Sequence, residues 1–247
     1  MIFSGWEFVA AAVAVFGAAV VRGFAGFGFS ALTVAMLTMM AKPAMVVPMV
    51  FMLEIAASLW MLPSLWRQVD FRWVALVGIG LAFGSPAGVF LLANVSADIL
   101  RPIIYVVLSA VSIIALLQHS GKMARWRAPP VVAGLAAGIG NGMAAIGGVI
   151  CALFLLADKE RKPARIRASL AGMFLLTDIY ALLWGGALGV AGAAHLQSAA
   201  LLLPALFGGI IIGSRLFGRS DPQKYRAVAL AVILAAAIAA MLRQLAL

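Results

Sequence analysis

Long apolar runs separated by short charged links make up the whole chain. Runs near 20 residues long are typical of helices that span a bilayer. Six such runs follow one another at 43–62, 73–92, 98–117, 168–190, 196–213 and 227–242. No polar stretch exceeds roughly 15 residues, which is well short of a soluble domain. The pattern therefore predicts a single all-α integral membrane domain over residues 1–247.

Two further apolar segments, 6–41 and 131–157, are each interrupted by a glycine-rich break. The first break reads GFAGFGFS over residues 23–30, and the second reads GIGNGMAAIGG over residues 138–148. Segment 6–41 is too long for one simple span of about 20 residues, and glycine favours an irregular turn. Each segment is therefore predicted to form two short helices joined by a turn.

The two halves of the chain match at small residues and at prolines. With an offset of 119 residues, three positions are identical, namely Gly23 and Gly142, Ala25 and Ala144, and Gly28 and Gly147. With an offset of 120 residues, the two Lys-Pro-Ala triplets coincide, at 42–44 and 162–164. These coincidences predict an internal repeat over about 6–117 and 129–243.

The charges on the links indicate an orientation in the membrane. Four links are basic, whereas the links 93–97 and 191–196 contain no Lys or Arg; the basic ones are 67–72, 118–127, 158–167 and 214–226. The positive-inside rule places the basic links in the cytoplasm, with 158–167 acting mainly as a topogenic loop. Segment 131–157 must then enter and leave on the same side, as a re-entrant pair.

If segment 6–41 behaves in the same way, each half makes three full crossings, and the second half is inverted relative to the first. The predicted fold is then two pseudo-symmetric halves, each a glycine-broken, re-entrant helical pair followed by three transmembrane helices. The alternative counts each broken segment as one span. It gives eight crossings in two parallel halves and leaves one basic loop outside.

Composition narrows the function classes. Hydrophobic residues make up 65% of the chain and charged residues 11%, against about 25% charged in soluble domains. The net charge of +10 lies in the links, so it does not indicate nucleic-acid binding. Glu7 is the only charge before Arg22, so we expect no cleavable signal peptide. A lone Cys151 and two isolated histidines, His119 and His195, predict no disulfide, metal site or cofactor.

The glycine breaks are the strongest functional feature. Irregular backbone at membrane depth persists where it lines a cavity or binds a solute. A helix that starts after such a turn directs free N–H groups and a positive dipole end toward it, which suits an anion. We predict that the breaks meet near mid-membrane and bind a small anion. The alternative is close helix packing through small residues four apart, as at Gly138 and Gly142.

Polar side chains near the breaks add to this site. The Ser30 hydroxyl and the Asn141 amide supply donors, and Arg22 can neutralise an anion with a bidentate guanidinium. The alternative for Arg22 is an interfacial side chain that snorkels or anchors a helix end. The residues assigned to the substrate site are Arg22, Gly23, Gly26, Phe27, Gly28, Ser30, Asn141, Gly142, Ile146, Gly147 and Gly148.

Two carboxylates, Glu54 and Asp178, fall in the middle of predicted spans. Carboxylates inside a membrane are costly and usually functional, so both are candidates for carrying a coupling proton. The alternative is a neutral or hydrogen-bonded carboxyl that joins two helices. Asp98 and Arg101 stand at a span end, where an ion pair or an anchor is expected.

The two glycine segments, each leading into an apolar run and a basic turn with small residues, resemble the TauE/SafE sulfite exporter family, also called the toluene-sulfonate uptake permeases. The second segment, 142–148, is closer to the family pattern. The first has Phe29 and Ser30 where a further glycine is usual. The resemblance implies a multi-pass transporter of the bacterial cytoplasmic membrane that moves sulfite, sulfonates, sulfoacetate or related anions.

Together these features predict a secondary transporter of small sulfur-containing anions that works by alternating access and is coupled to protons. The alternatives are an anion channel and a non-transporting membrane scaffold. An enzyme is not expected, because no HExxH, paired-Asp or Ser–His arrangement occurs within the spans. The expected partners are the anion and the bilayer, without nucleic acid. Small-residue faces allow a homodimer.

Overall fold

The part of the chain that the structure describes contains helices and no strands. The computed structural model describes residues 2–122, 128–156, 162–217 and 222–245. The elements in chain order are α1 (Trp6–Ala25), α2 (Phe29–Leu37), α3 (Pro43–Leu65), the 3-10 turn η1 (Trp66–Gln68), α4 (Phe71–Asn94), α5 (Ala97–His119), α6 (Pro130–Ala144), α7 (Gly147–Leu156), α8 (Pro163–Ala187), α9 (Ala193–Phe217) and α10 (Pro222–Leu245). The predicted all-α integral membrane class is confirmed.

Within these residues, six helices are long and apolar enough to cross a membrane, namely α1, α3, α4, α5, α8 and α9. Both glycine-rich segments break into two helices as predicted, giving α1 and α2 in the first half and α6 and α7 in the second. Each broken pair is followed by three long helices. The Lys-Pro-Ala triplets begin α3 and α8, with Lys42 and Lys162 as extended N-cap residues. Proline suits the first helical turn because its missing N–H has no intrahelical partner there.

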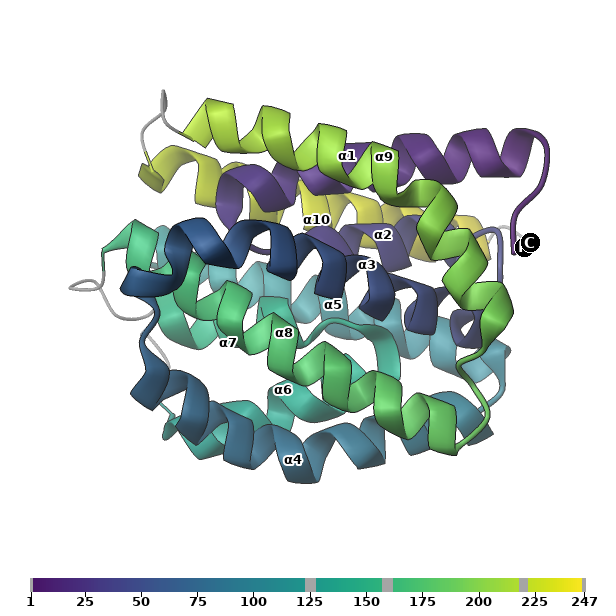
Figure 1. Cartoon of the computed structure of the whole chain (residues 1–247), viewed down its shortest axis with the longest axis horizontal. Helices are drawn as coiled ribbons and strands as arrows, with labels where there is room; N and C mark the ends of the chain where they lie inside the picture. Colours follow the sequence, from purple (N-terminus) through teal and green to yellow (C-terminus); the bar gives the residue numbers. More distant parts are fainter. Residues whose placement is uncertain (1, 123–127, 157–161, 218–221, 246–247) are drawn as a thin grey trace.

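The first broken pair enters and leaves at one end of the molecule. The backbone N–H of Ile2 donates to Ser198 Oγ at 2.8 Å. His195 Nε2 lies 3.3 Å from the carbonyl oxygen of Ala44. Because both partners lie in the first turns of α9, the start of α1 and the start of α3 are at the same end (Figure 1). Both ends of the pair α1–α2 therefore lie at this end of the molecule, as the predicted re-entrant pair requires.

The second pair lies the other way round. Helix α8 begins at the far end, where the side chain of Arg165 lies 3.6 Å from that of Asp70, the residue just before α4. Figure 1 shows α6 beginning and α7 ending at that same end. The two pairs thus begin at opposite ends of the molecule, and the inverted pseudo-symmetry of the two halves stays a prediction. The internal repeat over 6–117 and 129–243 stays a prediction.

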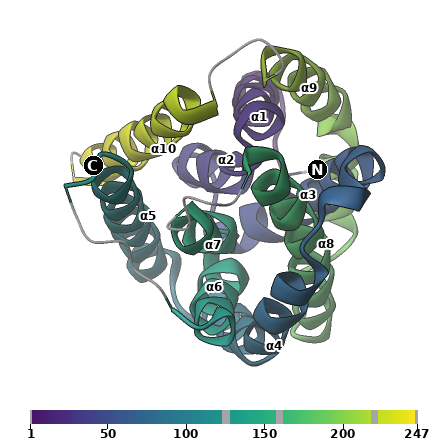
Figure 2. The same cartoon turned by 90° about the vertical axis from the view of Figure 1, so that its left-hand side faces the viewer.

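Helices α2 and α7 lie in the interior, and longer helices surround them (Figure 2). Every residue of α2 except Met36 is buried. Large apolar side chains on the outer helices are exposed instead, such as Phe83 and Phe90 on α4 and Leu183 on α8. An apolar outside around a polar centre is the distribution expected of a helical protein in lipid.

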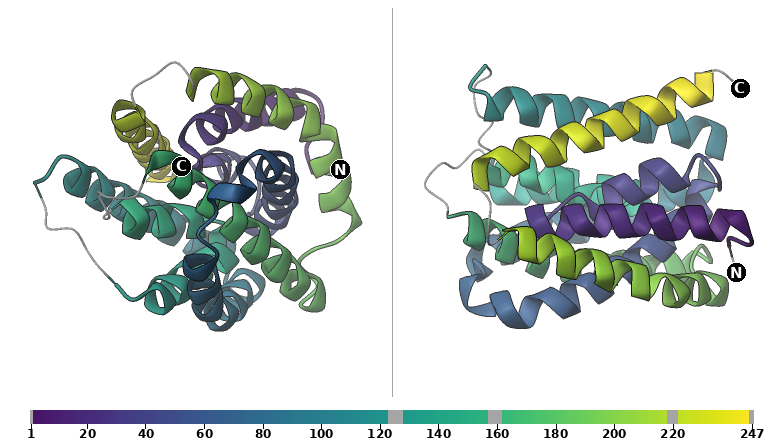
Figure 3. Two further views of the ribbon diagram at one scale, coloured as in Figure 1. Left: turned by 60° about the vertical axis from the view of Figure 1, so that its left-hand side comes forward. Right: turned by 90° about the horizontal axis from the view of Figure 1, so that it is seen from above.

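The described basic side chains divide unequally between the two ends. One end, called here the basic end, carries Arg67, Arg72, Lys122, Lys162, Arg165 and Arg215. The opposite end holds the start of α1 and the end of α10 (Figure 3) and carries Lys42, Arg101 and Arg243. Parts of the predicted basic loops, at 123–127, 157–161 and 218–221, lie outside the described residues. The positive-inside rule assigns the basic end to the cytoplasm.

Candidate functional site

Arg22 lies at the centre of the site. Its side chain is fully buried near the end of α1, at 0% exposure. One terminal nitrogen lies 3.2 Å from Glu54 Oε2 and donates to Ser58 Oγ, also at 3.2 Å, and the other donates to the Gly26 carbonyl. A buried guanidinium needs such partners. The snorkelling alternative is therefore wrong, because no part of Arg22 reaches the surface.

An aromatic ring from the other half completes the surroundings of Arg22. The guanidinium carbon lies 4.1 Å from the ring centroid of Phe174 on α8. This is a cation–π contact, which strengthens where water is excluded. Arg22 thus joins the first break to α3 and α8 together.

Glu54 lies halfway along α3 and is fully buried. Besides Arg22, it faces Ser30 in the first turn of α2. The N-terminus of a helix offers N–H groups and a positive dipole end to an anion. In this structure the carboxylate of the protein itself takes the position predicted for a bound anion at the first break.

Asn141 and Asp178 form the corresponding contact at the second break. The Asn141 amide, in the last turn of α6, donates to Asp178 Oδ1 on α8 at 2.8 Å. Asp178 is buried and lies within electrostatic range of both Arg22 and Glu54. Four buried polar residues predicted separately from the sequence therefore gather in one cluster between the breaks: Arg22, Glu54, Asn141 and Asp178.

The two breaks use different residues for the left-handed backbone. In the first, Gly26 (φ 82°) and Gly28 (φ 93°) take it, as glycine is expected to do. In the second, Ala145 takes it (φ 54°), while Gly147 and Gly148 open α7. Gly147 and Gly148 matter instead because a side chain at either position would collide with a neighbouring residue. A Cβ on Gly148 would lie 2.0 Å from the Phe174 ring, and one on Gly147 would lie 2.7 Å from Asn141 Cβ.

Two of the predicted site glycines serve helix packing. A Cβ on Gly23 would lie 2.4 Å from the Ile210 carbonyl of α9, and one on Gly142 would lie 2.4 Å from the Ser85 carbonyl of α4. The packing alternative therefore holds for these two positions. The middle residues of the two turns, Phe27 and Ile146, are buried in the apolar core.

Arg167 borders the first break, and the sequence did not single it out because it closes the charged stretch 158–167. It is only 8% exposed, and its chain packs on Gly26, where a Cβ would lie 2.5 Å from Arg167 Cγ. Its guanidinium donates to Ser214 Oγ at 2.9 Å and stacks over Phe217. The sequence does carry a signal for Arg167. Phe174 lies seven residues after it and Asp178 four residues further on, a spacing that places all three on one face of α8.

Residues 11–240 match the family described as sulfite exporter TauE/SafE. The chain belongs to the TauE/SafE family. The match covers nearly the whole chain and includes both breaks and the buried cluster. No curated protein and no solved structure matched the chain.

Membership confirms the resemblance read from the two glycine segments. The TauE/SafE family is one of membrane transporters of sulfur-containing anions such as sulfite, and the long apolar helices make this member a multi-pass membrane protein. Among the described residues no group of three His, Cys, Asp or Glu could hold a metal ion.

The turn at Gly26 gives a direct test of the first break in this TauE/SafE protein. Gly26→Ala should lower anion uptake at least tenfold and destabilise the protein by about 1–2 kcal/mol, the cost of an L-residue in the left-handed region. The added Cβ also displaces Arg167. Gly17→Ala on α1 is the control, because its Cβ meets nothing within 4 Å. Equal uptake by the two variants would contradict the assignment.

Proposed function

We propose that this protein is a secondary transporter that moves a small sulfur-containing anion, such as sulfite, a sulfonate or sulfoacetate, across the bacterial cytoplasmic membrane. One observation carries the proposal. Arg22, buried in the interior of the helix bundle, contacts the first break, α3 and α8 at once. An unshielded guanidinium at that depth is costly, and a sulfonate or sulfite oxygen pair suits its fork.

Glu54 acts in this proposal as an internal substitute for the substrate. Its carboxylate holds Arg22 and faces the start of α2, so a substrate anion and ionised Glu54 compete for the same groups. Protonation of Glu54 removes the competitor and leaves Arg22 for the anion. The charged and polar groups that face Glu54 are Arg22 from α1, Ser30 from α2 and Asp178 from α8. Anion binding is thereby linked to uptake of a proton.

Correspondences between the halves support alternating access. With the offsets of the sequence repeat, Arg22 corresponds to Asn141 and Ser58 to Asp178, and each half joins its own pair by a hydrogen bond. Helix α1 packs on α9, and α6 packs on α4, which are equivalent pairs under inversion. Rocking of one half against the other would then expose the central cluster to each end in turn. A homodimer stays a prediction.

Glu54→Gln and Asp178→Asn should separate the two proton candidates. Glu54→Gln is expected to keep uptake but to lose its stimulation by a proton gradient, because the glutamine amide cannot take up a proton. Asp178→Asn is expected to respond like wild type, since an amide can still bond Asn141. Uptake into proteoliposomes with and without the gradient measures both, with Glu7→Gln as the matched control. Loss of the response only in Asp178→Asn would transfer the role to Asp178.

The transport proposal is tested by uptake of labelled sulfite, sulfoacetate and a simple sulfonate into proteoliposomes, with and without an imposed pH gradient. Saturable uptake that accumulates under the gradient is expected. Flux that only equilibrates across the membrane would indicate an anion channel. No uptake of any of the three by folded protein would leave the scaffold alternative.

A further inference from the structure

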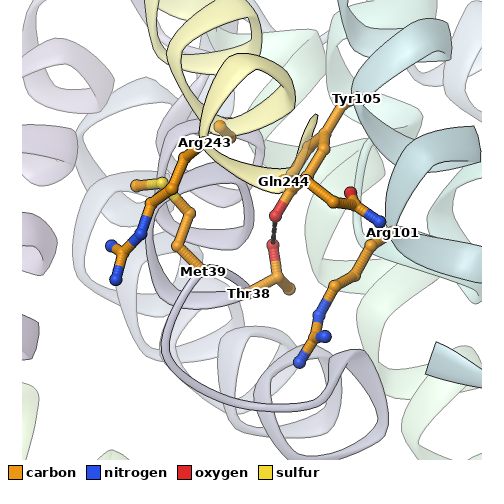
Figure 4. A pocket seen from close by; sticks show the side chains of 7 residues that line it. Thr38, Met39, Arg101, Tyr105, Arg243 and Gln244 are labelled. Atoms are coloured by element: carbon orange, nitrogen blue, oxygen red, sulfur yellow. Dashed lines mark hydrogen bonds between the residues drawn. The ribbon is translucent and has the colours of Figure 1, made fainter. Parts of the chain in front are cut away.

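A pocket at the opposite end of the molecule is separate from the central cluster. It lies where α2 ends, α5 begins and α10 ends, and it is lined by Thr38, Met39, Arg101, Tyr105, Ala240, Arg243 and Gln244. In Figure 4 the two arginines come from different helices on either side of the Thr38–Tyr105 hydrogen bond, which is 2.9 Å long. We propose that this pocket is a second binding site for an oxyanion of sulfur or phosphorus.

The charge of the pocket is the first argument. Arg101 and Arg243 are two of the three described basic residues at this end, and both line the pocket. The positive-inside rule does not account for them, because it favours Lys and Arg at the basic end. Both guanidinium groups lie within electrostatic range of the Tyr105 hydroxyl. Two cations beside one space make its electrostatic potential positive, which favours an anion there.

Among the described residues, the lining of this pocket offers no carboxylate to these cations. None of its lining residues is Asp or Glu. Asp98 lies 3.9 Å from Arg101, but its side chain is 94% exposed, and such exposed pairs are weak. Arg101 also donates to the Ala41 carbonyl, yet its Nε is buried without a hydrogen-bond partner among the described residues. Donors are therefore available to an incoming anion.

Size and place restrict the ligand. The cavity volume is about 50 Å³, far below the roughly 300–1,000 Å³ of pockets for drug-sized ligands, so it suits a small ion or a single phosphate group. Helix α2 connects it with the central cluster, since Ser30 faces Glu54 at one end and Thr38 lines the pocket at the other. Nine residues of helix span about 13 Å.

Two sources can supply this ligand chemistry. One is the transported anion, in which case the pocket is a station on its route, and this identification rests on the proposed function. The other is the phosphate of an anionic lipid headgroup, which guanidinium groups bind through the same contacts. Binding at the pocket itself does not depend on transport, so it can be measured even if the transport proposal fails.

Arginine labelling measures occupancy of the pocket directly. Purified protein in nanodiscs is treated with phenylglyoxal, and modification of Arg243 is followed by peptide mass spectrometry. Arg67, exposed at the basic end, is the internal control. The experiment is done in neutral phosphatidylcholine with and without methanesulfonate, and again in phosphatidylglycerol. Arg101→Gln tests the pocket, and Lys42→Gln controls for charge at the same end.

Protection of Arg243 but not Arg67 by methanesulfonate in neutral lipid would identify the free anion. Protection only in phosphatidylglycerol would identify the headgroup. In either case Arg101→Gln should raise about tenfold or more the concentration of methanesulfonate or of phosphatidylglycerol that half-protects Arg243. Lys42→Gln should leave that concentration unchanged. Equal labelling of Arg243 and Arg67 under all conditions would overturn the proposal, as would unchanged protection in Arg101→Gln.

Discussion

Arg22→Met is expected to abolish anion uptake and to lower the free energy of unfolding by about 3–5 kcal/mol, the cost of leaving a buried charge without its partner. Glu54 is fully buried and its ion pair with Arg22 is lost. The loss of stability should be smaller in acid, where Glu54 takes up a proton. Thermal unfolding of detergent-purified protein at two pH values measures the loss of stability. Uptake of the anion into proteoliposomes measures the loss of transport.

The double variant Arg22→Met/Glu54→Met separates stability from function. Replacement of a whole buried ion pair by apolar residues of similar volume is often neutral or stabilising. The double variant should therefore recover most of the lost stability and remain inactive. Arg72→Met, at an exposed arginine in the first turn of α4, is the control and should transport normally. Wild-type uptake by the double variant would exclude Arg22 from the anion site.

A substitution at the contact between α4 and α6 is expected to have the next largest effect on stability and uptake. A Cβ on Gly84 would lie 2.3 Å from the carbonyl oxygen of Leu135, a backbone atom that no side-chain rotation can move. Gly84→Ala is expected to destabilise the protein by about 1–3 kcal/mol through overpacking. It should also reduce uptake, because α6 carries Asn141. Thermal unfolding and uptake together measure the two effects.

Gly78→Ala on the same helix is the matched control. A Cβ on Gly78 meets nothing within 4 Å, so alanine should be neutral or stabilise the helix by up to about 1 kcal/mol. Equal stability of the two variants would show that α4 and α6 do not pack as closely as these distances require.

The helical arrangement was largely readable from the sequence, because glycine and proline act locally. The Lys-Pro-Ala triplets mark the starts of α3 and α8, and Gly26 and Gly28 take the left-handed backbone that only glycine adopts easily. Ala145 escaped prediction because alanine carries no signal for that conformation. Its positive φ belongs to the C-cap of α6, where the N–H groups of Ala145 and Ile146 donate to the carbonyls of Asn141 and Gly140.

The contents of the cluster were predicted, but its pairing was not. Arg22, Glu54 and Asp178 stood out because charges within apolar spans are rare. Which of them meet depends on how α1, α3 and α8 rotate and approach one another, and no local residue pattern encodes this. Arg167 was missed for a related reason, because its charged neighbours made it resemble part of a loop although it lies one turn inside α8.

The competition between Glu54 and the substrate is tested most directly by the affinity of purified protein for methanesulfonate as a function of pH. The sulfonate stays ionised throughout, so only protein groups titrate. Wild type should bind more tightly as the pH falls, by up to about tenfold per pH unit while one proton is taken up. Glu54→Gln should bind tightly at every pH. An identical pH dependence in both proteins would contradict the account.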